Sequence, residues 1–219
     1  MGVDPAARGT DRAAAERLVD VSRETWTRWE ALVAALDKWQ ATMNLVAPNT
    51  LATVWTRHVA DGAQLLPLAP QDARMWVDLG SGGGFPGLVV AAALAGRTQV
   101  HLVESNLKKA AFLREAARTM DVAVTVHAAR AEAVLGPVVP RADVVSARAL
   151  APLADLIAMA APLLKTGAVG LFPKGEKAEA ELTAAAKSWN INASFHPSLT
   201  EPDARIVRVD GLAERRGAE

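Results

Sequence analysis

A glycine-dense turn between two carboxylates is the part of the chain best suited to binding a ligand. An apolar run ends at Asp78 and is followed by Gly80, Gly82 and Gly84. A second apolar run ends at Glu104. Glycine is needed where the backbone takes a positive φ or where a Cβ would hold a ligand away. A carboxylate after the next strand can accept hydrogen bonds from both hydroxyls of a ribose. The pattern predicts a site for a nucleoside cofactor.

Two cofactors fit these glycines. Gly82, Gly84 and Gly87 match G-x-G-x-x-G, the dinucleotide fingerprint, with Glu104 as the ribose acid. The same turn also reads as an acid two residues before G-x-G-x-G, starting at Asp78. In that frame the loop surrounds the methionine part of S-adenosylmethionine, and Asp78 faces its ammonium group. Because a dinucleotide site prefers no carboxylate beside its phosphates, the acid favours S-adenosylmethionine.

Both acids have a structural alternative. Asp78 could cap the turn by accepting hydrogen bonds from N–H groups of the loop. Glu104 could instead be the N-cap of the helix that opens at residues 105–106. For Asp78 the capping role and the ligand role are compatible with each other.

Short apolar runs alternate with helical segments after residue 74, which is typical of an α/β fold with a mainly parallel, doubly wound sheet. We expect strands at 75–79, 99–103, 123–127, 142–146, 168–172, 193–196 and 205–209, and helices near 86–95, 106–120, 152–164 and 176–189. An apolar stripe at helical spacing covers 16–40, a further helix covers 51–66, and residues 1–12 look frayed. The chain of 219 residues therefore divides into an N-terminal helical extension (1–70) packed on a cofactor-binding domain (71–219).

Ligands of such a sheet bind beyond the carboxyl ends of its strands, so residues that follow a strand are candidates. Ala131 and Glu132 follow the third strand, where a loop can flank an adenine ring. Arg148 and Lys174 follow the fourth and fifth strands and are cations that could hold a base oxygen or RNA phosphates. The alternative is that both cations extend into solvent or pair with nearby acids.

Missing residue types exclude several chemistries. The chain has no cysteine, which removes a thiolate metal site and the nucleophile used for methylation at C5 of pyrimidines. It has no tyrosine, which removes the Tyr/Lys dyad of short-chain dehydrogenases. A ring nitrogen such as guanine N7 needs neither a nucleophile nor a general base, because its lone pair is free at neutral pH. Alignment of the two reactants can then supply most of the catalysis.

Global composition indicates a cytoplasmic protein. There are 24 basic and 24 acidic residues, so any face that binds nucleic acid must be local. No apolar run reaches the length of about 20 residues that a membrane span needs. The mixed charge of residues 1–18 does not match a secretion signal.

The assembled motifs resemble the bacterial 16S ribosomal RNA guanine-N7 methyltransferases, the RsmG or glucose-inhibited division protein B family. The resemblance runs from about residue 26 to residue 209. The segments that carry it are 39–45 (WQATMNL), 57–62 (RHVADG), 78–87 (DLGSGGGFPG), 130–132 (RAE), 146–149 (SARA) and 172–175 (FPKG). The glycine loop alone indicates only a methyltransferase, whereas its Phe-Pro-Gly ending with R-H-x-x-D upstream is more specific. Gly62 departs from the serine that the family usually has after Asp61.

The resemblance implies a Rossmann-like class I S-adenosylmethionine-dependent methyltransferase with a seven-stranded sheet. It implies transfer to N7 of a guanine in the decoding region of 16S ribosomal RNA, in free RNA or in the small subunit. Cofactor contacts carry over to a set of positions that also includes the ribose acid: Gly80, Phe85, Glu104, Ala131, Glu132 and Arg148. We expect a monomer that needs no metal and no membrane.

The RNA-contacting residues are less defined. The expected substrate-binding set is Arg57, His58, Arg130 and Lys174, with Arg148 and Lys174 also expected at the methyl-transfer rim. His58 has the alternative of packing between the N-terminal helices and the sheet, tied by Asp61 one helical turn later. Lys108 and Lys109 are either RNA contacts or a solvated helix face.

Three other functions stay open. They are a nicotinamide-dependent oxidoreductase, a ribosome-assembly factor that keeps the fold but has lost methyl transfer, and a methyltransferase for another RNA or a small molecule.

Trp26 and Trp29 share the apolar stripe and are expected in the core. For Trp55 packing is expected rather than stacking on a base.

Overall fold

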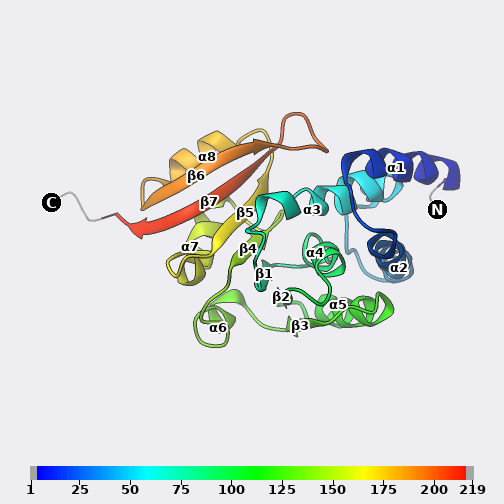
Figure 1. Cartoon of the computed structure of the whole chain (residues 1–219), viewed down its shortest axis with the longest axis horizontal. Coiled ribbons are helices and arrows are strands. Elements are labelled where there is room, and N and C mark those ends of the chain that lie inside the picture. Colours follow the sequence, from blue (N-terminus) through cyan, green and yellow to red (C-terminus); the bar gives the residue numbers. More distant parts are fainter. Residues whose placement is uncertain (1–3, 216–219) are drawn as a thin grey trace.

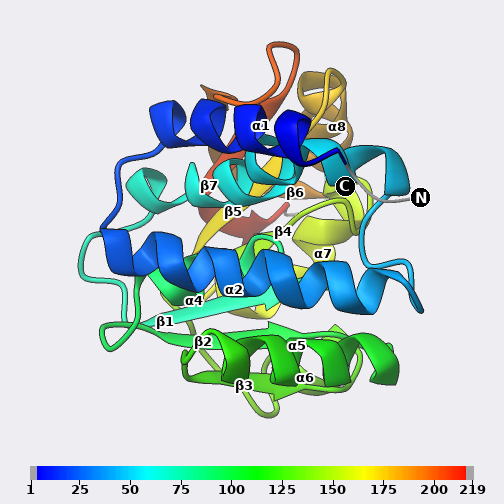
Figure 2. The same cartoon turned by 90° about the vertical axis from the view of Figure 1, so that its right-hand side faces the viewer.

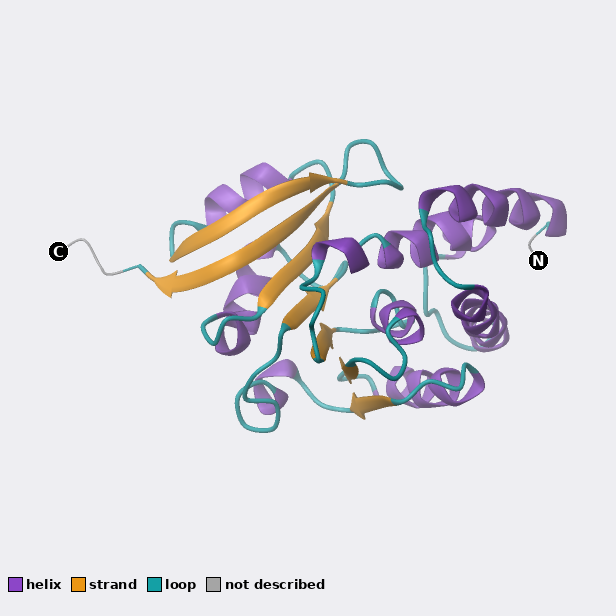
Figure 3. Ribbon diagram, viewed as in Figure 1, coloured by secondary structure: helices purple, strands orange, loops and turns teal. Residues whose placement is uncertain are grey.

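The computed structural model describes residues 4–215, and their centre is one sheet with the strand order β3-β2-β1-β4-β5-β7-β6 (Figures 1 and 3). The strands are β1 (Met75–Leu79), β2 (Gln99–Val103), β3 (Val124–His127), β4 (Val144–Ala147), β5 (Val169–Lys174), β6 (Trp189–Pro197) and β7 (Arg205–Glu214). β1 to β5 pair in parallel, whereas β7 is antiparallel to both β5 and β6. The expected mainly parallel sheet of seven strands is confirmed.

Helices cover both faces of the sheet because successive side chains of a strand point to opposite sides. One layer contains α2 (Arg23–Gln40), α4 (Gly87–Ala93) and α5 (Leu107–Thr119), and the other contains α6 (Ala131–Val134), α7 (Leu153–Leu164) and α8 (Ala178–Ala185). On β1, Trp76 belongs to the core beneath the first layer, whereas Val77 and Leu79 belong to the core beneath the second. In Figure 1 the two layers lie to the right and to the left of the sheet.

The N-terminal region contains two helices, whereas the apolar stripe at 16–40 predicted one. α1 (Pro5–Leu18) and α2 are separate helices, each begun by a side-chain cap, from Asp4 to the N–H of Ala6 and from Ser22 to the N–H of Thr25. Residues 5–12 are therefore helical rather than frayed, and residues 1–3 lie outside the described part. Figure 2 has these helices nearest the viewer and shows them side by side.

The segment 48–68 is helical but irregular. It contains η1 (Pro48–Thr53), η2 (Trp55–Ala60), α3 (Asp61–Ala63) and η3 (Leu66–Leu68), of which η2 has the wider π geometry. Asp11 of α1 accepts the N–H of Trp55 at 2.8 Å and so fixes the start of η2. The boundary expected near residue 70 stays a prediction, although the sheet begins shortly after it at Met75.

The tryptophans of this region are packing residues, as expected. Trp29 is fully buried and donates its indole N–H to the carbonyl of Val89 at 3.0 Å. Trp26 and Trp55 hold the guanidinium of Arg12 between them, 4.4 Å from each ring centroid. In the described residues no helix is long and apolar enough to cross a bilayer.

Candidate functional site

The glycine loop between β1 and α4 has the geometry that its composition predicts. Gly80, Gly82 and Gly84 have φ values of +63°, +50° and +86°. Residues with a Cβ rarely adopt these values, so the loop requires glycine. A Cβ at Gly80 would also lie 2.6 Å from the Cδ1 atom of Leu150, which follows β4. At Gly80 the loop is therefore packed directly against Leu150.

Glu104 joins this loop to the next βα turn. Its side chain is 8% exposed. One carboxylate oxygen accepts the N–H of Gly82 at 2.9 Å, and the other accepts the N–H of Asn106 at 2.7 Å. Each oxygen keeps a further lone pair for a ligand. The N-cap of α5 is Asn106, which accepts the N–H groups of Lys108 and Lys109, so that capping role does not fall to Glu104.

A cavity of about 280 Å³ opens at this edge of the sheet. Six of the expected site residues line it, namely Gly80, Gly82, Glu104, Arg130, Ala131 and Glu132. The remaining walls come from apolar residues such as Ala129, Leu150 and Met159, and from Lys109. Gly84 and Phe85 lie outside the lining, and Phe85 is buried against His58 with ring centroids 5.1 Å apart.

A larger cavity of about 910 Å³ lies at the opposite, amino-terminal edge of the strands, beside Arg74, Gln99 and Ala123. It contains none of the expected site residues and no strand-following loop. We place the candidate site in the smaller cavity, because parallel sheets bind ligands at their carboxyl ends and the glycine loop and Glu104 converge there.

Asp78 does not line the cavity, and the expectation that it faces the methionine part of the cofactor stays a prediction. Its carboxylate is fully buried. One oxygen accepts the hydroxyl of Ser146 at 2.7 Å and the other the N–H of Gly87 at 3.2 Å. Burial raises the pKa of Asp78 to about 6, although the hydrogen bonds from Ser146 and Gly87 act to lower it. Asp78 thus supports the loop from below, as in the capping alternative.

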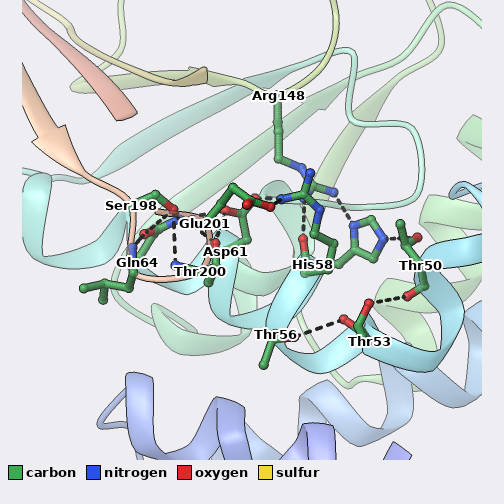
Figure 4. A network of polar contacts seen from close by, with 12 residues as sticks. Thr50, Thr53, Thr56, His58, Asp61, Gln64, Arg148, Ser198, Thr200 and Glu201 are labelled. Atoms are coloured by element: carbon green, nitrogen blue, oxygen red, sulfur yellow. Dashed lines mark hydrogen bonds and ion pairs between the residues drawn. The ribbon is translucent and has the colours of Figure 1, made fainter. Parts of the chain in front are cut away.

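Arg148 does not line the cavity and belongs instead to a network of polar contacts (Figure 4). Its expected role at the methyl-transfer rim stays a prediction. Its guanidinium donates to the carboxylate of Asp61 at 2.9 Å, to the carbonyl of Arg57 at 2.9 Å and to Nδ1 of His58 at 2.7 Å. The ion pair with Asp61 is mostly shielded, with the two side chains 17% and 11% exposed. The alternative reading of this cation, as a partner of a nearby acid, describes the structure.

These contacts fix the tautomer of His58. Arg148 can only donate, so Nδ1 of His58 accepts and Nε2 carries the proton. Nε2 donates to the hydroxyl of Thr50 at 2.7 Å, and that hydroxyl donates to the carbonyl of Ala47 at 2.7 Å. Burial, together with the positive charges of Arg148 and Arg57, lowers the pKa of His58 to about 3. His58 is therefore a neutral, buried link, as in the packing alternative, and its expected substrate-binding role stays a prediction.

The same network reaches the loop between β6 and β7. The second oxygen of Asp61 accepts the hydroxyl of Thr200 at 2.8 Å and the amide of Gln64 at 2.8 Å. Gln64 in turn accepts the N–H of Leu199 at 2.7 Å. Sequence reasoning missed Gln64 and Thr200, because neither belongs to a recognisable motif and Thr200 lies 139 residues from Asp61.

Lys174 is committed in a similar way. Its ammonium donates to the carbonyl of Ala151 at 3.0 Å and pairs with Glu181 of α8 at 2.7 Å. Glu181 also accepts the N–H of Leu153 at 2.7 Å. The Lys174 side chain is only 12% exposed. In this structure the cation holds a loop, and its expected catalytic and RNA-binding roles stay predictions. No sequence signal identified Glu181 as its partner.

Two expected cations remain exposed. Arg130 lines the cavity mouth and makes no ion pair within residues 4–215. Arg57 pairs with Glu201 at 3.0 Å, but both side chains are 46% exposed. Lys109 lines the cavity, whereas Lys108 is exposed outside the lining.

The cavity fits an adenosine-containing cofactor. Glu104 offers a carboxylate at the position of a ribose, the glycine loop offers open backbone, and Ala129, Ala131 and Leu150 offer apolar surface for a flat base. No group of three or more metal-binding side chains occurs among the described residues.

Comparison with known proteins agrees with this geometry. The family described as rRNA small subunit methyltransferase G matches residues 26–207. A protein of Methylorubrum populi named ribosomal RNA small subunit methyltransferase G is 54% identical over 196 residues, which are 89% of this chain and 92% of that protein. A protein of the same name from Bradyrhizobium diazoefficiens is 53% identical over 213 residues, which are 94% of this chain and 79% of that protein.

Solved structures support the fold alone. A putative O-methyltransferase from Klebsiella pneumoniae aligns with a TM-score of 0.61 at 14% identity, covering 93% of this chain and 96% of that one. An O-methyltransferase from Bacillus cereus in complex with SAH aligns with a TM-score of 0.59 at 15% identity, covering 92% and 97%. With the sheet order, the glycine loop and the family match in place, the chain is an S-adenosylmethionine-dependent methyltransferase and belongs to the rRNA small subunit methyltransferase G family.

Proposed function

We propose that this enzyme transfers the methyl group of S-adenosylmethionine to N7 of a guanine in the decoding region of 16S ribosomal RNA, in the cytoplasm. The observation that carries the proposal is the family match across residues 26–207, joined to relatives at 54% and 53% identity that are named ribosomal RNA small subunit methyltransferase G. The choice of N7 rests on the family resemblance and on the chemistry below.

The side chains of the cavity suit an acceptor that is nucleophilic when neutral. Its titratable groups are Glu104, which already accepts two N–H groups, and the residues Lys109, Arg130 and Glu132. Guanine N7 attacks the sulfonium methyl with its own lone pair, the C–S bond breaks, and a neutral thioether leaves. The chain then has to bind and align the two reactants. This alignment can remove a large part of the activation barrier.

Each supporting residue has a defined task in this proposal. Glu104 holds the ribose hydroxyls, and Ala131 and Glu132 flank the adenine. The glycine loop surrounds the methionine part, and Asp78 keeps that loop in shape through the N–H of Gly87. When bound, S-adenosylmethionine supplies the electrophilic methyl group.

RNA contact falls to the accessible cations. Arg130 at the cavity mouth is the first candidate, and the exposed Arg57 is the second. A guanidinium can bind a phosphate or the O6 and N7 edge of a guanine, and here a phosphate contact leaves N7 free to react. We also propose that the enzyme acts as a monomer and without a metal.

The test is a methyl-transfer assay with labelled S-adenosylmethionine, offered small ribosomal subunits in one reaction and naked 16S RNA in another. N7-methylguanine is then located through strand cleavage by borohydride and aniline. A single labelled guanine in the decoding region supports reaction, cofactor and substrate together. Cofactor binding without label in either RNA would keep the fold and overturn the substrate. Label at a different atom or nucleotide would overturn the N7 assignment.

A further inference from the structure

Leu150 is an exposed leucine whose side chain forms part of the cavity wall. It is 40% exposed, and yet it lines the cavity and lies directly over Gly80, where an added Cβ would come within 2.6 Å of its Cδ1 atom. The side chain thus rests on the glycine loop at the wall of the cavity. An exposed leucine over a ligand cavity is an apolar surface that a ligand can cover.

The backbone beneath Leu150 does not adopt its conformation freely. Ala149 has a φ of +52°, a left-handed value that residues with a Cβ adopt only when the surroundings impose it. Side-chain contacts on both sides of the loop must therefore offset this strain. The structure shows such contacts at each end of the segment 148–153.

At the upstream end Arg148 is anchored by Asp61, His58 and the carbonyl of Arg57. At the downstream end two charged side chains each bind one backbone group of the loop. Lys174 donates to the carbonyl of Ala151 at 3.0 Å, and Glu181 accepts the N–H of Leu153 at 2.7 Å.

The two downstream groups also pair with each other at 2.7 Å, with side chains 12% and 27% exposed. Lys174 comes from the end of β5 and Glu181 from α8. Neither lines the cavity, so any effect on the cofactor has to pass through the loop. This mostly shielded pair binds one C=O and one N–H of the same loop, and we call Lys174 and Glu181 the clasp.

We propose that Leu150 is an apolar cap that contacts bound S-adenosylmethionine, and that Lys174 and Glu181 are positioning residues that hold this cap over Gly80. The proposal rests on the cofactor-binding part of the proposed function. It replaces a catalytic role for Lys174 by an indirect one, because the ammonium points into the loop backbone.

The test is a mutant cycle read by calorimetric titration of the full chain with S-adenosylmethionine alone. Leu150→Ala and Lys174→Met should each weaken binding about tenfold, the ratio expected when part of one apolar contact is lost. The double variant should bind no more weakly than either single one, because Lys174 acts through Leu150. Lys174→Arg, which keeps a charge and donors, should restore most of the affinity.

A matched control is available at the far end of β7, where Lys165 pairs with Glu214. Lys165→Met breaks a Lys–Glu pair outside the cavity and should leave cofactor affinity unchanged. If Lys174→Met does not fold, Glu181→Gln takes its place, since it removes the charge of the clasp and keeps the shape. Thermal melts establish that each titration is performed on folded protein.

These outcomes distinguish failure of the Leu150 proposal from failure of the proposed function. Wild-type affinity in Leu150→Ala, or losses that multiply in the double variant, would overturn the clasp while cofactor binding by the wild type keeps the enzyme assignment. A loss of thermal stability in Lys174→Met with unchanged affinity would reduce the pair to a structural one and also overturn the proposal. No binding by the wild type would instead overturn the cofactor site itself.

Discussion

The two halves of the carboxyl edge of the sheet use their charged side chains in opposite ways. Beside β1, β2 and β3, Glu104 and Arg130 line the cavity and keep bonding capacity for a ligand. Beside β4 and β5, Arg148 and Lys174 are paired with acids and bound to backbone carbonyls. In the first half the charged side chains can still bind a ligand, whereas in the second half they hold loops of the chain in place.

This difference shows that position after a strand does not by itself assign a chemical role. All four side chains lie at the carboxyl ends of strands of the same sheet, where ligands bind. What separates them is whether another segment of the chain supplies a counter-charge, as α3 with Asp61 does for Arg148 and α8 with Glu181 does for Lys174. Four substitutions test this division, beginning with the largest expected effect.

Arg148→Met should lower the free energy of unfolding by about 3 kcal/mol, because it removes the counter-charge of Asp61 and leaves one shielded oxygen of that carboxylate and Nδ1 of His58 without a donor. Chemical denaturation measures the loss. Arg57→Met is the control, since its pair with Glu201 is exposed and should contribute less than about 1 kcal/mol. Equal small losses in both variants would contradict the holding role of the second half.

Glu104→Ala should weaken cofactor binding by about 1.5–3 kcal/mol, the scale of a hydrogen bond to a charged group. Titration calorimetry with S-adenosylmethionine measures it. Glu132→Ala, which removes an exposed carboxylate from the same cavity, should lose less. Unchanged affinity in Glu104→Ala would end its assignment to the ribose.

His58→Asn tests the neutral link through pH. The pKa of His58 is about 3 in the folded chain against an ordinary value of 6.5, so as pH falls below 6.5 the unfolded chain binds a proton first and the folded state loses stability. The contribution is at most about 1.4 kcal/mol per pH unit. Asp78, with its pKa raised to about 6, acts with the opposite sign, since its part of the stability falls as pH rises from 3.8 to 6.

Denaturation of wild type and His58→Asn at several pH values between 4 and 7 therefore isolates the histidine. The wild type should lose stability relative to the variant as pH falls through this window. Parallel curves for the two proteins would show that His58 is not held neutral in the folded chain.

Arg130→Ala should have the smallest effect, and on RNA rather than on stability. Loss of one phosphate contact should reduce the slope of log affinity against log salt by about 1. Filter binding to 16S RNA over a salt series measures the slope. Lys187→Ala, an exposed cation outside the cavity, should keep the wild-type slope. Identical slopes for all three proteins would remove Arg130 from the RNA interface.

Local pattern predicted the elements next to the cofactor well. The bounds of β1 and β2 match the apolar runs at 75–79 and 99–103, because those strands are buried and end in glycine or a carboxylate. α5 and α7 agree with their expected ranges within one residue at each end. Ser22 was the missing signal in the N-terminal stripe, since its side chain caps α2 and separates it from α1.

Pairing across long sequence distances could not be predicted in the same way. Arg148 lies 87 residues from Asp61, and Lys174 needs a glutamate on a helix whose rotation the sequence leaves open. The six expected residues that line the cavity lie on the βα loops of β1, β2 and β3 or at the start of α6, and the position of these segments follows from topology alone. Sequence reasoning thus located the binding edge, whereas the partners of its cations needed coordinates.

The place of β7 in the sheet has a consequence for how the chain is synthesised. β6 forms its ladder with β7 alone, and β7 also completes the edge of β5. While residues 205–214 are still being made, β6 has no partner and β5 presents an open edge, which is the kind of surface on which chains aggregate. The loop that binds Gln64 and Asp61 closes at the same moment. The first and last parts of the chain therefore become ordered together, late, and a polypeptide stopped before residue 205 would be a client for chaperones and proteases rather than a smaller enzyme.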